Sequence, residues 1–418
     1  MSIAYKKNRL HMEGADLEAV AKEFGTPSYC YSATQIVENF RRYKDALGSV
    51  TDDFTICYAC KANSNQAVLN LLRKEGAGAD IVSGGELLRA LKAKIPASKI
   101  VYSGVGKSEK ELELAIRKGI FQINVESETE LESISKIAQR LKKTVSVAIR
   151  VNPNVDAKTH AKITTGKKEN KFGIDIAKAP ALYARAKKMK GVKAVGVAVH
   201  IGSQLTTLAP FKRAYERVAD LVRLLRRKGH DITRVDLGGG MGITYKDETP
   251  PDLYFYALMI RDVILPLNVH VILEPGRSIT GDAGILLSRV VSVKKGDTRT
   301  FLILDAAMND RLRPSLYGAY HAVLPYRKAA KNTVYDVVGP ICETGDTFLT
   351  GEKLPKLKRG DLVAIMTSGA YGAVMASNYN TRPFATEVLV KGKKAARVRK
   401  QQKAEDVINN DIVPGWVA

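Results

Sequence analysis

Several features that would narrow the function of this 418-residue sequence are scarce or absent. It holds four cysteines, too few for a disulfide scaffold at this length. No apolar run is long enough for a membrane helix, and no apolar segment follows the basic start of the chain. We therefore expect no signal peptide, no membrane association and a cytoplasmic location. Apolar residues make up 45% of the chain, which is typical of a globular protein, and the length favours two domains.

Acidic residues are also scarce, with 43 Asp and Glu against 66 Lys and Arg and a net charge of +23. Such an excess can indicate a nucleic-acid partner. The basic residues are spread over predicted helix faces and turns, however. There is no zinc-finger spacing and no basic segment interleaved with regularly placed aromatics. A solvated basic surface is the favoured interpretation, so we expect no specific nucleic-acid partner, and the excess itself stays unexplained.

Cys57 and Cys60 form the one C-x-x-C pair, a spacing that occurs in redox and metal sites. There is no second pair. The motif lies in or at the end of a predicted strand, where residues three apart point to opposite faces. The sequence therefore favours buried or loop thiols, and we expect no metal site.

The chain is organised around the stretch from Phe54 to Asn65, FTICYACKANSN, with Lys61 at its centre. Its first half is rich in apolar and aromatic residues and reads as a buried strand, and a helical pattern begins at Gln66. A lysine at the mouth of a buried strand has three explanations. Its stem can snorkel to solvent, its amine can pair with a carboxylate, or the amine can be desolvated to act as a nucleophile.

From Phe54 onward, short strand-like segments alternate with amphipathic helical patterns such as GELLRALKAK and KELELAIRKG. This alternation predicts a parallel sheet, and eight units predict a closed (β/α)8 barrel in an α/β fold. The polar segment 151–173, after the fifth strand, is predicted to be a lid or binding loop, with disorder as the alternative. The predicted strands begin near Phe54, Ala79, Ile100, Gln122, Val145, Ala194, Ile232 and Val269.

After about Gly276 the pattern changes to short strands parted by turn signals, among them LLSRVVSVKK, TRTFLILDAA, TVYDVVGPIC, DLVAIM and TEVLVKGKK. This predicts a second, mainly antiparallel β domain. We expect residues 1–33 to pack with that domain, residues 34–276 to form the barrel, and residues 277–418 to form the β domain.

In a barrel of this kind, chemistry belongs to the carboxyl ends of the strands. Too many polar groups follow the predicted strands for a satisfied core. In strand order they are Lys61, Asp80 with Ser83, Ser103, Glu126, Arg150 with Asn152, His200 with Ser203, Gly238 to Gly240, and Glu274 with Arg277.

The glycine run in DLGGGMGI lets backbone N–H groups approach a phosphate, although a tight turn explains such a run as well. Ser203 and Arg277 on neighbouring strand ends favour a phosphate pocket. His200 alone could be a structural histidine, and Glu274 could be an ion-pair partner of Arg277. Together, a lysine, a phosphate pocket, a flat imidazole and a carboxylate match the needs of one cofactor, pyridoxal 5′-phosphate.

The sequence also resembles the diaminopimelate decarboxylases, which belong with ornithine decarboxylase to the barrel-type, fold type III, pyridoxal-phosphate decarboxylases. The resemblance runs from about Tyr58 to Pro383. The segments that carry it are YACKANSN, GADIVSGGELLRAL, YSGVGK, RVNPNVDAKTH, TTGKKENKFGI, VHIGSQL, DLGGGMGI, LEPGRSI, DAAMNDRLRPSLYGAYH, VVGPICETGD and GAYGAVMASNYNTRP.

The resemblance implies decarboxylation of meso-2,6-diaminopimelate to L-lysine and carbon dioxide, the last step of lysine biosynthesis. It implies that Lys61 holds the cofactor as a Schiff base, that His200 stacks on the cofactor ring and that Glu274 faces the pyridine nitrogen. It implies a homodimer with shared sites, in which Cys342, the proton donor, and Glu343 reach the partner subunit's site. The other implied cofactor-binding residues are Asp80, Arg150, Ser203, Gly239, Gly240, Pro275, Gly276, Arg277 and Tyr371. The implied substrate-binding residues are Arg277, Arg313, Tyr317, Glu343 and Tyr371.

Two alternatives stay open. One is another enzyme of the same fold, an ornithine- or arginine-type decarboxylase or a racemase, which would lack the arginine–tyrosine pair of RPSLYGAY that grips a second carboxylate. The other is a non-catalytic regulator or cofactor carrier. The intact Lys61, Glu274 and Cys342 argue against this second alternative.

Overall fold

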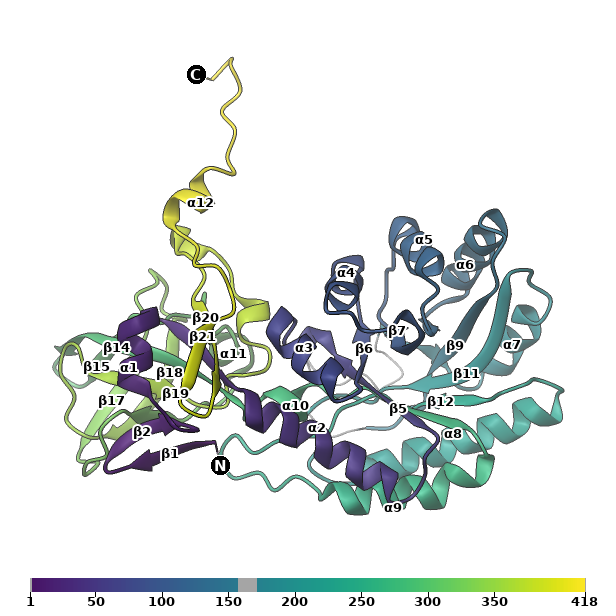
Figure 1. The fold of residues 1–418 in the computed structure, drawn as a ribbon, viewed down its shortest axis with the longest axis horizontal. Helices are drawn as coiled ribbons and strands as arrows, with labels where there is room; N and C mark the ends of the chain where they lie inside the picture. Colours follow the sequence, from purple (N-terminus) through teal and green to yellow (C-terminus); the bar gives the residue numbers. More distant parts are fainter. Residues whose placement is uncertain (1, 157–170, 418) are drawn as a thin grey trace. The chain divides into compact units, whose positions relative to one another are not determined.

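The computed structural model describes residues 2–156 and 171–417, and the chain divides into two compact units (Figure 1). The barrel unit comprises Val37–Thr244 and Glu248–Ile279. The β unit comprises Met1–Ile36, Tyr245–Asp247 and Thr280–Ala418. Segments from both ends of the chain therefore build the β unit, and the barrel unit is formed mainly by the sequence between them.

The barrel unit is a closed ring of parallel strands, because the first and last strands of the ring pair with each other and every neighbouring pair is parallel. All residues of several of these strands are buried, as expected for a parallel sheet covered on both faces. In ring order the strands are β5 (Phe54–Ala59), β6 (Gly78–Ile81), β7 (Ile100–Tyr102), β8 (Gln122–Val125), β9 (Val145–Asn152), β11 (Val192–Val199), β12 (Arg234–Asp236) and β13 (His270–Leu273). A short strand, β10 (Ile174–Asp175), pairs in parallel with the last two residues of β9.

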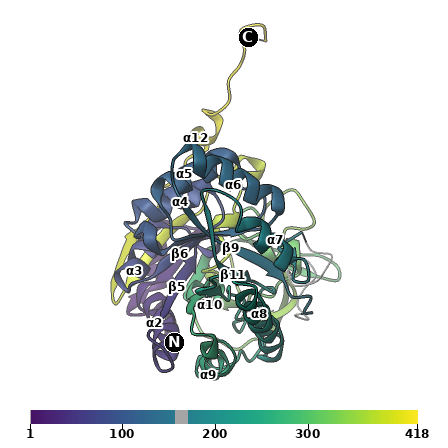
Figure 2. The ribbon, with the colours of Figure 1, turned by 90° about the vertical axis from the view of Figure 1, so that its right-hand side faces the viewer.

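Helices cover the outside of the ring, as Figure 2 shows for α4, α5, α6 and α8. Several begin at a serine or asparagine whose side chain accepts a backbone N–H of the first turn; Ser108 does so in a full capping box with Glu111. The helices are α2 (Ala33–Gly48), α3 (Gln66–Lys74), α4 (Gly84–Lys92), α5 (Glu109–Lys118), α6 (Glu128–Arg140), α7 (Ala179–Ala186), α8 (Ala209–Arg227), α9 (Leu253–Val263) and α10 (Arg277–Thr280). Short 3₁₀ turns lie at Cys60–Ala62, Ala97–Lys99 and Leu265–Leu267.

The predicted (β/α)8 barrel is confirmed, and each predicted strand start lies within two residues of the observed one. Most of the predicted lid, residues 157–170, lies outside the described residues. The four cysteines are free thiols; Cys57 and Cys60 are buried, as the sequence favoured.

The β unit contains a mixed sheet in which most neighbours are antiparallel, which confirms the predicted class of the second domain. The strand order is β18-β17-β15-β14-β4-β20-β21, with β19 pairing with β14 and β16, and the two parallel pairs are β15–β17 and β4–β20. The strands are β4 (Ser28–Ser32), β14 (Gly284–Lys295), β15 (Thr300–Leu304), β16 (Val323–Pro325), β17 (Thr333–Val338), β18 (Thr347–Leu354), β19 (Leu362–Ile365), β20 (Thr386–Lys391) and β21 (Lys394–Arg397).

The start of the chain adds a small antiparallel sheet to the β unit and helps to fill its core. Leu10, Met12 and Leu17 are buried there against Ile285 and Val390. The elements are β1 (Ile3–Lys6), β2 (Arg9–Met12), β3 (Ala15–Asp16) and α1 (Leu17–Phe24); later in the chain come α11 (Arg313–Tyr317), the 3₁₀ turns Ala373–Met375 and Tyr379–Thr381, and α12 (Ala404–Ile408). Among the helices of the described ranges, none is both long and apolar enough to cross a membrane.

Candidate active site

Lys61 lies directly after β5, in the 3₁₀ turn Cys60–Ala62, and its side chain reaches a neighbouring strand. Its Nζ donates a hydrogen bond of 2.7 Å to Oδ2 of Asp80, a residue of β6. The Asp80 side chain is fully buried, whereas the Lys61 side chain is 35% exposed. Of the three explanations for this lysine, pairing with a carboxylate is the one that the geometry shows.

Glu274, the first residue after β13, is the centre of a buried polar cluster. Its Oε1 accepts hydrogen bonds from Ser103 Oγ at 3.0 Å and from Asn124 Nδ2 at 3.4 Å. Asn124 Nδ2 also donates to Asp236 Oδ2 at 2.8 Å, and the carboxyl groups of Asp236 and Glu274 are hydrogen-bonded to each other. Two carboxyl groups therefore share one buried pocket at the ends of β12 and β13.

Burial controls the charge of this carboxyl pair. It raises the pKa of Asp236 to about 6. It raises the pKa of Glu274 well above the usual range, and the neighbouring charges of Asp236 and Asp80 act in the same direction. Two buried carboxylates cannot both be charged at low cost unless a cation joins them. This pair is thus suited to hold a proton, or to lose it when a positively charged group binds.

His200 follows β11 directly and faces the glycine run. Its Nδ1 accepts a hydrogen bond from the backbone N–H of Gly239 at 3.3 Å, which assigns the ring proton to Nε2 in the neutral form. Burial lowers the pKa of His200 well below its usual value, and the positive charges of Arg150 and Lys61 add to this effect. The imidazole is therefore neutral at physiological pH and suited to stack on an aromatic ring.

At the glycine run after β12, the backbone comes very close to the segments that follow β11 and β13. Gly238 and Gly240 have φ angles of +66° and +113°, which disfavour other residues. A Cβ on Gly239 would lie 2.2 Å from the carbonyl oxygen of Glu274, and one on Gly240 would lie 2.4 Å from that of Gly202. The segment that carries Ser203 pairs with this run, since Leu205 N donates to Gly240 O at 2.9 Å.

The Pro275 to Arg277 turn packs against the lysine turn. Pro275 O accepts a hydrogen bond from Ala59 N at 3.0 Å. A Cβ on Gly276 would lie 3.0 Å from the Cβ atoms of Ala59 and Ala62. Arg277 is buried and begins α10. The structure therefore brings Lys61, the glycine run and the LEPGR segment to one end of the barrel.

Arg150, predicted to bind the cofactor, forms a buried ion pair with Glu126, at 2.6 Å between Nη1 and Oε1. Glu126 also accepts backbone N–H groups from Gly104 at 3.2 Å and Gly173 at 2.7 Å. The arginine thus orders the ends of β8 and β9, and its charge also lowers the pKa of His200.

The remaining predicted residues belong to the β unit. Arg313 is buried at the start of α11, with its guanidinium 5.3 Å from the ring centroid of Tyr245 and 5.4 Å from that of Tyr317. Tyr371 has a φ of +50°. Cys342 and Glu343 are exposed. Glu343 forms a hydrogen bond with Tyr379 that raises the pKa of the tyrosine.

Sequence reasoning missed Asn124 and Asp236. Both lie within strands, whereas the sequence analysis selected polar residues that follow the predicted strands. A signal was available, because a buried strand of the barrel rarely carries an asparagine or aspartate without a polar partner. It also missed Glu86 on α4, whose carboxylate accepts Val82 N at 2.8 Å and whose pKa burial raises to about 7.

Comparisons with known proteins agree with this geometry. Residues 33–281 match the family model described as pyridoxal-dependent decarboxylase, pyridoxal binding domain. The chain is 45% identical to the diaminopimelate decarboxylase of Zymomonas mobilis, with 99% of each chain covered, and 47% identical to that of Pseudomonas aeruginosa, with 97% of each covered. The structure of diaminopimelate decarboxylase from Helicobacter pylori complexed with L-lysine superimposes with a TM-score of 0.91 at 44% identity, covering 94% of this chain and 99% of that one. This chain belongs to the diaminopimelate decarboxylase family of pyridoxal-dependent decarboxylases.

Proposed function

We propose that this protein uses pyridoxal 5′-phosphate to decarboxylate meso-2,6-diaminopimelate, giving L-lysine and carbon dioxide as the last step of lysine biosynthesis. The observation that carries the proposal is the pairing of Lys61 with buried Asp80 beside the Asp236–Glu274 carboxyl pair, at one end of the barrel. Sequence identity of 45% and 47% to two diaminopimelate decarboxylases, over nearly the full length of the chain, supports it.

The residues present fit the cofactor. The glycine run has no side chains, and Cβ atoms added at Gly239 and Gly240 would collide with neighbouring backbone, so only a glycine backbone can follow this path and approach a phosphate closely. The second carboxylate oxygen of Asp80, Oδ1, is buried and has no hydrogen-bond partner among the described residues. The Lys61 amine would hold the cofactor covalently. The phosphate would be bound by Ser203, Gly239, Gly240, Pro275 to Arg277 and Tyr371, with Asp80 and Arg150 ordering the surrounding polar groups.

When bound, the cofactor supplies an electron sink for the bond that breaks. Glu274 would face the ring nitrogen, because a protonated ring nitrogen is the positive partner that this buried carboxyl pair lacks. The neutral imidazole of His200 would cover one face of the ring. Asp80 would hold the Lys61 amine when that amine is released, and Cys342 would give a proton to the carbon that lost its carboxylate.

Substrate choice would depend on the end of diaminopimelate that does not react. That end carries an ammonium and a second carboxylate. Arg277 and Arg313 with Tyr317 supply charge-assisted donors for the carboxylate, and Glu343 with Tyr371 supplies acceptors for the ammonium. Ornithine and lysine have no second carboxylate, so they would leave the arginines unpaired, a penalty that discriminates strongly.

The experiment that tests this function is a cofactor absorbance spectrum combined with a carbon dioxide release assay on four substrates. We expect the absorption of a lysine-bound cofactor and turnover of meso-diaminopimelate far above that of lysine, ornithine or arginine. Comparable turnover of ornithine would favour the related decarboxylases instead. A bound cofactor without release of carbon dioxide from any of the four would favour the carrier.

We further propose that the enzyme is a cytoplasmic homodimer with shared sites, in which the partner's Cys342 and the partner's Glu343 complete each site. Both residues are exposed in the described chain, which suits a role at a neighbouring subunit. Mixing Lys61→Ala protein with Cys342→Ala protein should then restore activity, since one of the two sites in a mixed dimer carries both intact residues. If subunit exchange is proven and no activity returns, Cys342 serves the site of its own chain.

A further inference from the structure

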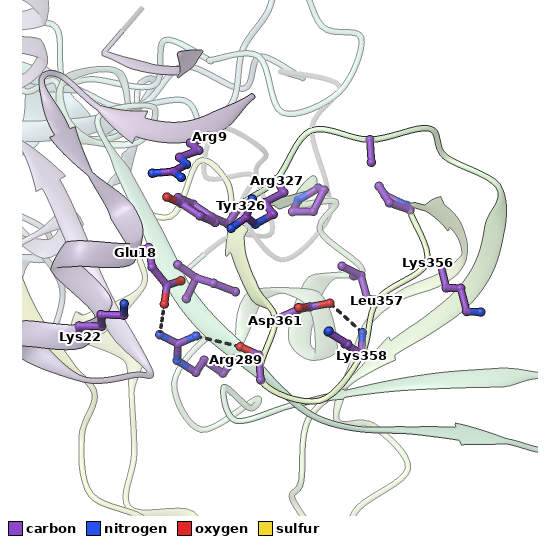
Figure 3. Close-up of a pocket in the computed structure, with 15 residues that line it drawn as sticks. Arg9, Glu18, Lys22, Arg289, Tyr326, Arg327, Lys356, Leu357, Lys358 and Asp361 are labelled. Carbon is purple, nitrogen blue, oxygen red and sulfur yellow. Dashed lines mark hydrogen bonds and ion pairs between the residues drawn. The ribbon is translucent and has the colours of Figure 1, made fainter. Parts of the chain in front are cut away.

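The β unit contains a concave site that is lined by none of the residues assigned above. It is a hollow with a volume of about 750 Å³, formed by β2, α1, β14, the strand end after β16 and the loop before β19 (Figure 3). We call it the basic hollow. Its charged lining residues are the basic Arg9, Lys22, Arg289, Arg327, Lys356 and Lys358 and the acidic Glu18 and Asp361.

Both acidic residues of the basic hollow already have a partner within the protein. Glu18 Oε1 forms an ion pair of 3.0 Å with Arg289, which also donates to the carbonyl of Gly360 at 2.8 Å. Asp361 Oδ2 accepts the backbone N–H of Lys358 at 2.8 Å, which fixes the loop (Figure 3). Arg289 is therefore neutralised and forms part of the wall.

The other five basic side chains have no such compensation. Lys22, Lys356 and Lys358 are exposed, as are the two remaining arginines. Within residues 2–156 and 171–417, none of the five forms an ion pair with a carboxylate. Asp361 accepts only a neutral backbone N–H, so its negative charge remains, but five such cations still leave a net positive charge around one concave surface that a bound anion would neutralise.

Two of the cations are held side by side by the backbone. Arg9 and Arg327 form an antiparallel bridge, which makes them direct cross-strand neighbours. Like charges at such positions are destabilising. Tyr326 lies beside them in Figure 3, and its hydroxyl donates to the carboxylate of Asp16, at 2.9 and 2.8 Å from the two oxygens. An anion between the two guanidinium groups would relieve this repulsion and accept their paired N–H groups.

The shape and the remaining lining indicate the size of the ligand. The volume is within the range of small-molecule sites, roughly 300–1,000 Å³. Pro325, Ala329, Pro355 and Leu357 supply apolar lining beside the cations. We propose that the basic hollow binds a compact anion with two or more phosphate groups, of the size of a nucleoside triphosphate. This site is independent of the decarboxylation reaction, since none of its residues belongs to the proposed catalytic or substrate-binding set.

The test is calorimetric titration of the full-length, cofactor-saturated protein with inorganic triphosphate and, separately, with ATP. Saturation with cofactor is needed because the barrel's own phosphate site would otherwise take up the anion. We expect one binding event per chain for triphosphate, weaker at higher salt because the contacts are ionic. Tighter binding of ATP than of triphosphate would show that the apolar lining contacts the nucleoside.

The variant that locates the site is Arg327→Ala with Lys356→Ala. Its matched control is Lys391→Ala with Lys394→Ala. These two exposed lysines are cross-strand neighbours in the same unit and do not line the hollow, so their replacement removes the same amount of charge from another place. We expect the first variant to lose about tenfold or more in triphosphate affinity and the control to lose less than about twofold. Neither should melt at a lower temperature than the unmodified protein without ligand.

Equal losses in the two variants would overturn the proposal in favour of diffuse attraction to a basic surface. Absence of triphosphate and ATP binding to the unmodified protein would overturn it outright. A charge reversal, Lys356→Glu, gives a second check that does not remove volume, and it should weaken binding more than Lys356→Ala. If an RNA oligonucleotide binds while both small anions fail, the ligand is a nucleic acid and the proposal for a compact anion is wrong.

Discussion

The polar cluster at the strand ends of the barrel and two buried charges of the β unit, those of Arg311 and Asp346, are satisfied in different ways. In the barrel, Lys61 pairs with the side chain of Asp80, and Glu274 pairs with Asp236. In the β unit, Arg311 donates to the carbonyls of Ala370 at 3.0 Å and Thr367 at 3.2 Å. Asp346 accepts the backbone N–H groups of Met308 at 2.6 Å and Ile341 at 2.7 Å.

The type of partner indicates whether a buried charge can take part in ligand binding or serves to stabilise the fold. A side chain that pairs with another side chain can exchange its partner for a ligand, because both can move or change protonation. A charge that pairs with backbone groups cannot do so without unfolding the segment that carries them. Substitutions in the barrel cluster should therefore affect the cofactor and the reaction, and substitutions at Arg311 and Asp346 should affect stability.

The largest effect is expected for Lys61→Ala. Loss of the amine that would hold the cofactor should lower turnover by about 10³-fold or more and abolish the absorption of the lysine-bound cofactor. Absorbance spectra and carbon dioxide release measure the two effects. The exposed Lys92→Ala on α4 is the control and should change neither. A Lys61→Ala protein that kept both the absorption and the activity would refute the assignment of this lysine.

Glu274→Gln should lower turnover by about 10²- to 10³-fold while the fold and some cofactor binding persist. An amide cannot become the negative partner of a protonated ring nitrogen, so the electron sink weakens. Turnover and the absorbance of the bound cofactor are measured together. Near-normal turnover would mean that Glu274 has only a structural role.

Arg311→Ala tests the other side of the comparison. It leaves two carbonyls without a donor and opens a cavity beside His321, so the free energy of unfolding should fall by about 3 kcal/mol. Denaturant unfolding measures the loss. The cofactor absorption of the protein that remains folded should be unchanged; a selective loss of cofactor without loss of stability would contradict the comparison.

Arg313→Ala should lower kcat/KM for meso-diaminopimelate by about 10²-fold and have little effect on the residual turnover of lysine. The difference in turnover between the two substrates would then become smaller, mainly because turnover of meso-diaminopimelate falls. Arg313→Lys keeps the charge but loses the fork of donors, so it should recover only part of the activity. Equal losses for both substrates would assign Arg313 to the general structure of the β unit.

Asp236→Asn should change how stability depends on pH. The pKa of Asp236 is raised to about 6 in the folded protein, against roughly 3.9 when unfolded, so the folded state binds more protons between these values. Its contribution to stability is therefore present below pH 4 and is lost as the pH rises to about 6, a loss on the order of 3 kcal/mol. The Asp236→Asn variant has no carboxyl group at this position to deprotonate, so it lacks this loss of stability. Urea unfolding of cofactor-free protein from pH 4 to 7 should show a shallower decline than for the exposed control Asp231→Asn, and parallel curves would contradict the pKa assignment.

Much of the barrel could be predicted from the sequence. The alternation of strands and helices has a local cause, because each amphipathic helix and each apolar strand is written in consecutive residues. The strand starts were accordingly predicted within two residues. The positions of Lys61, His200 and Glu274 at strand ends follow from the same pattern, since the carboxyl ends of parallel strands share one rim.

The fold class, the strand ends and the identity of the chemical groups that follow them could be read from local sequence patterns. Which of these groups pair depends on contacts between distant segments in the folded chain. Asn124 joins Asp236 to Glu274 across 112 and 150 residues of sequence, and no local pattern records such distances. Likewise, β4 lies between β14 and β20, and Arg9 lies beside Arg327, because the sheet of the β unit joins both ends of the chain. Side-chain contacts depend on packing between distant segments, and the protonation of buried groups depends on those contacts, so both were decided by folding.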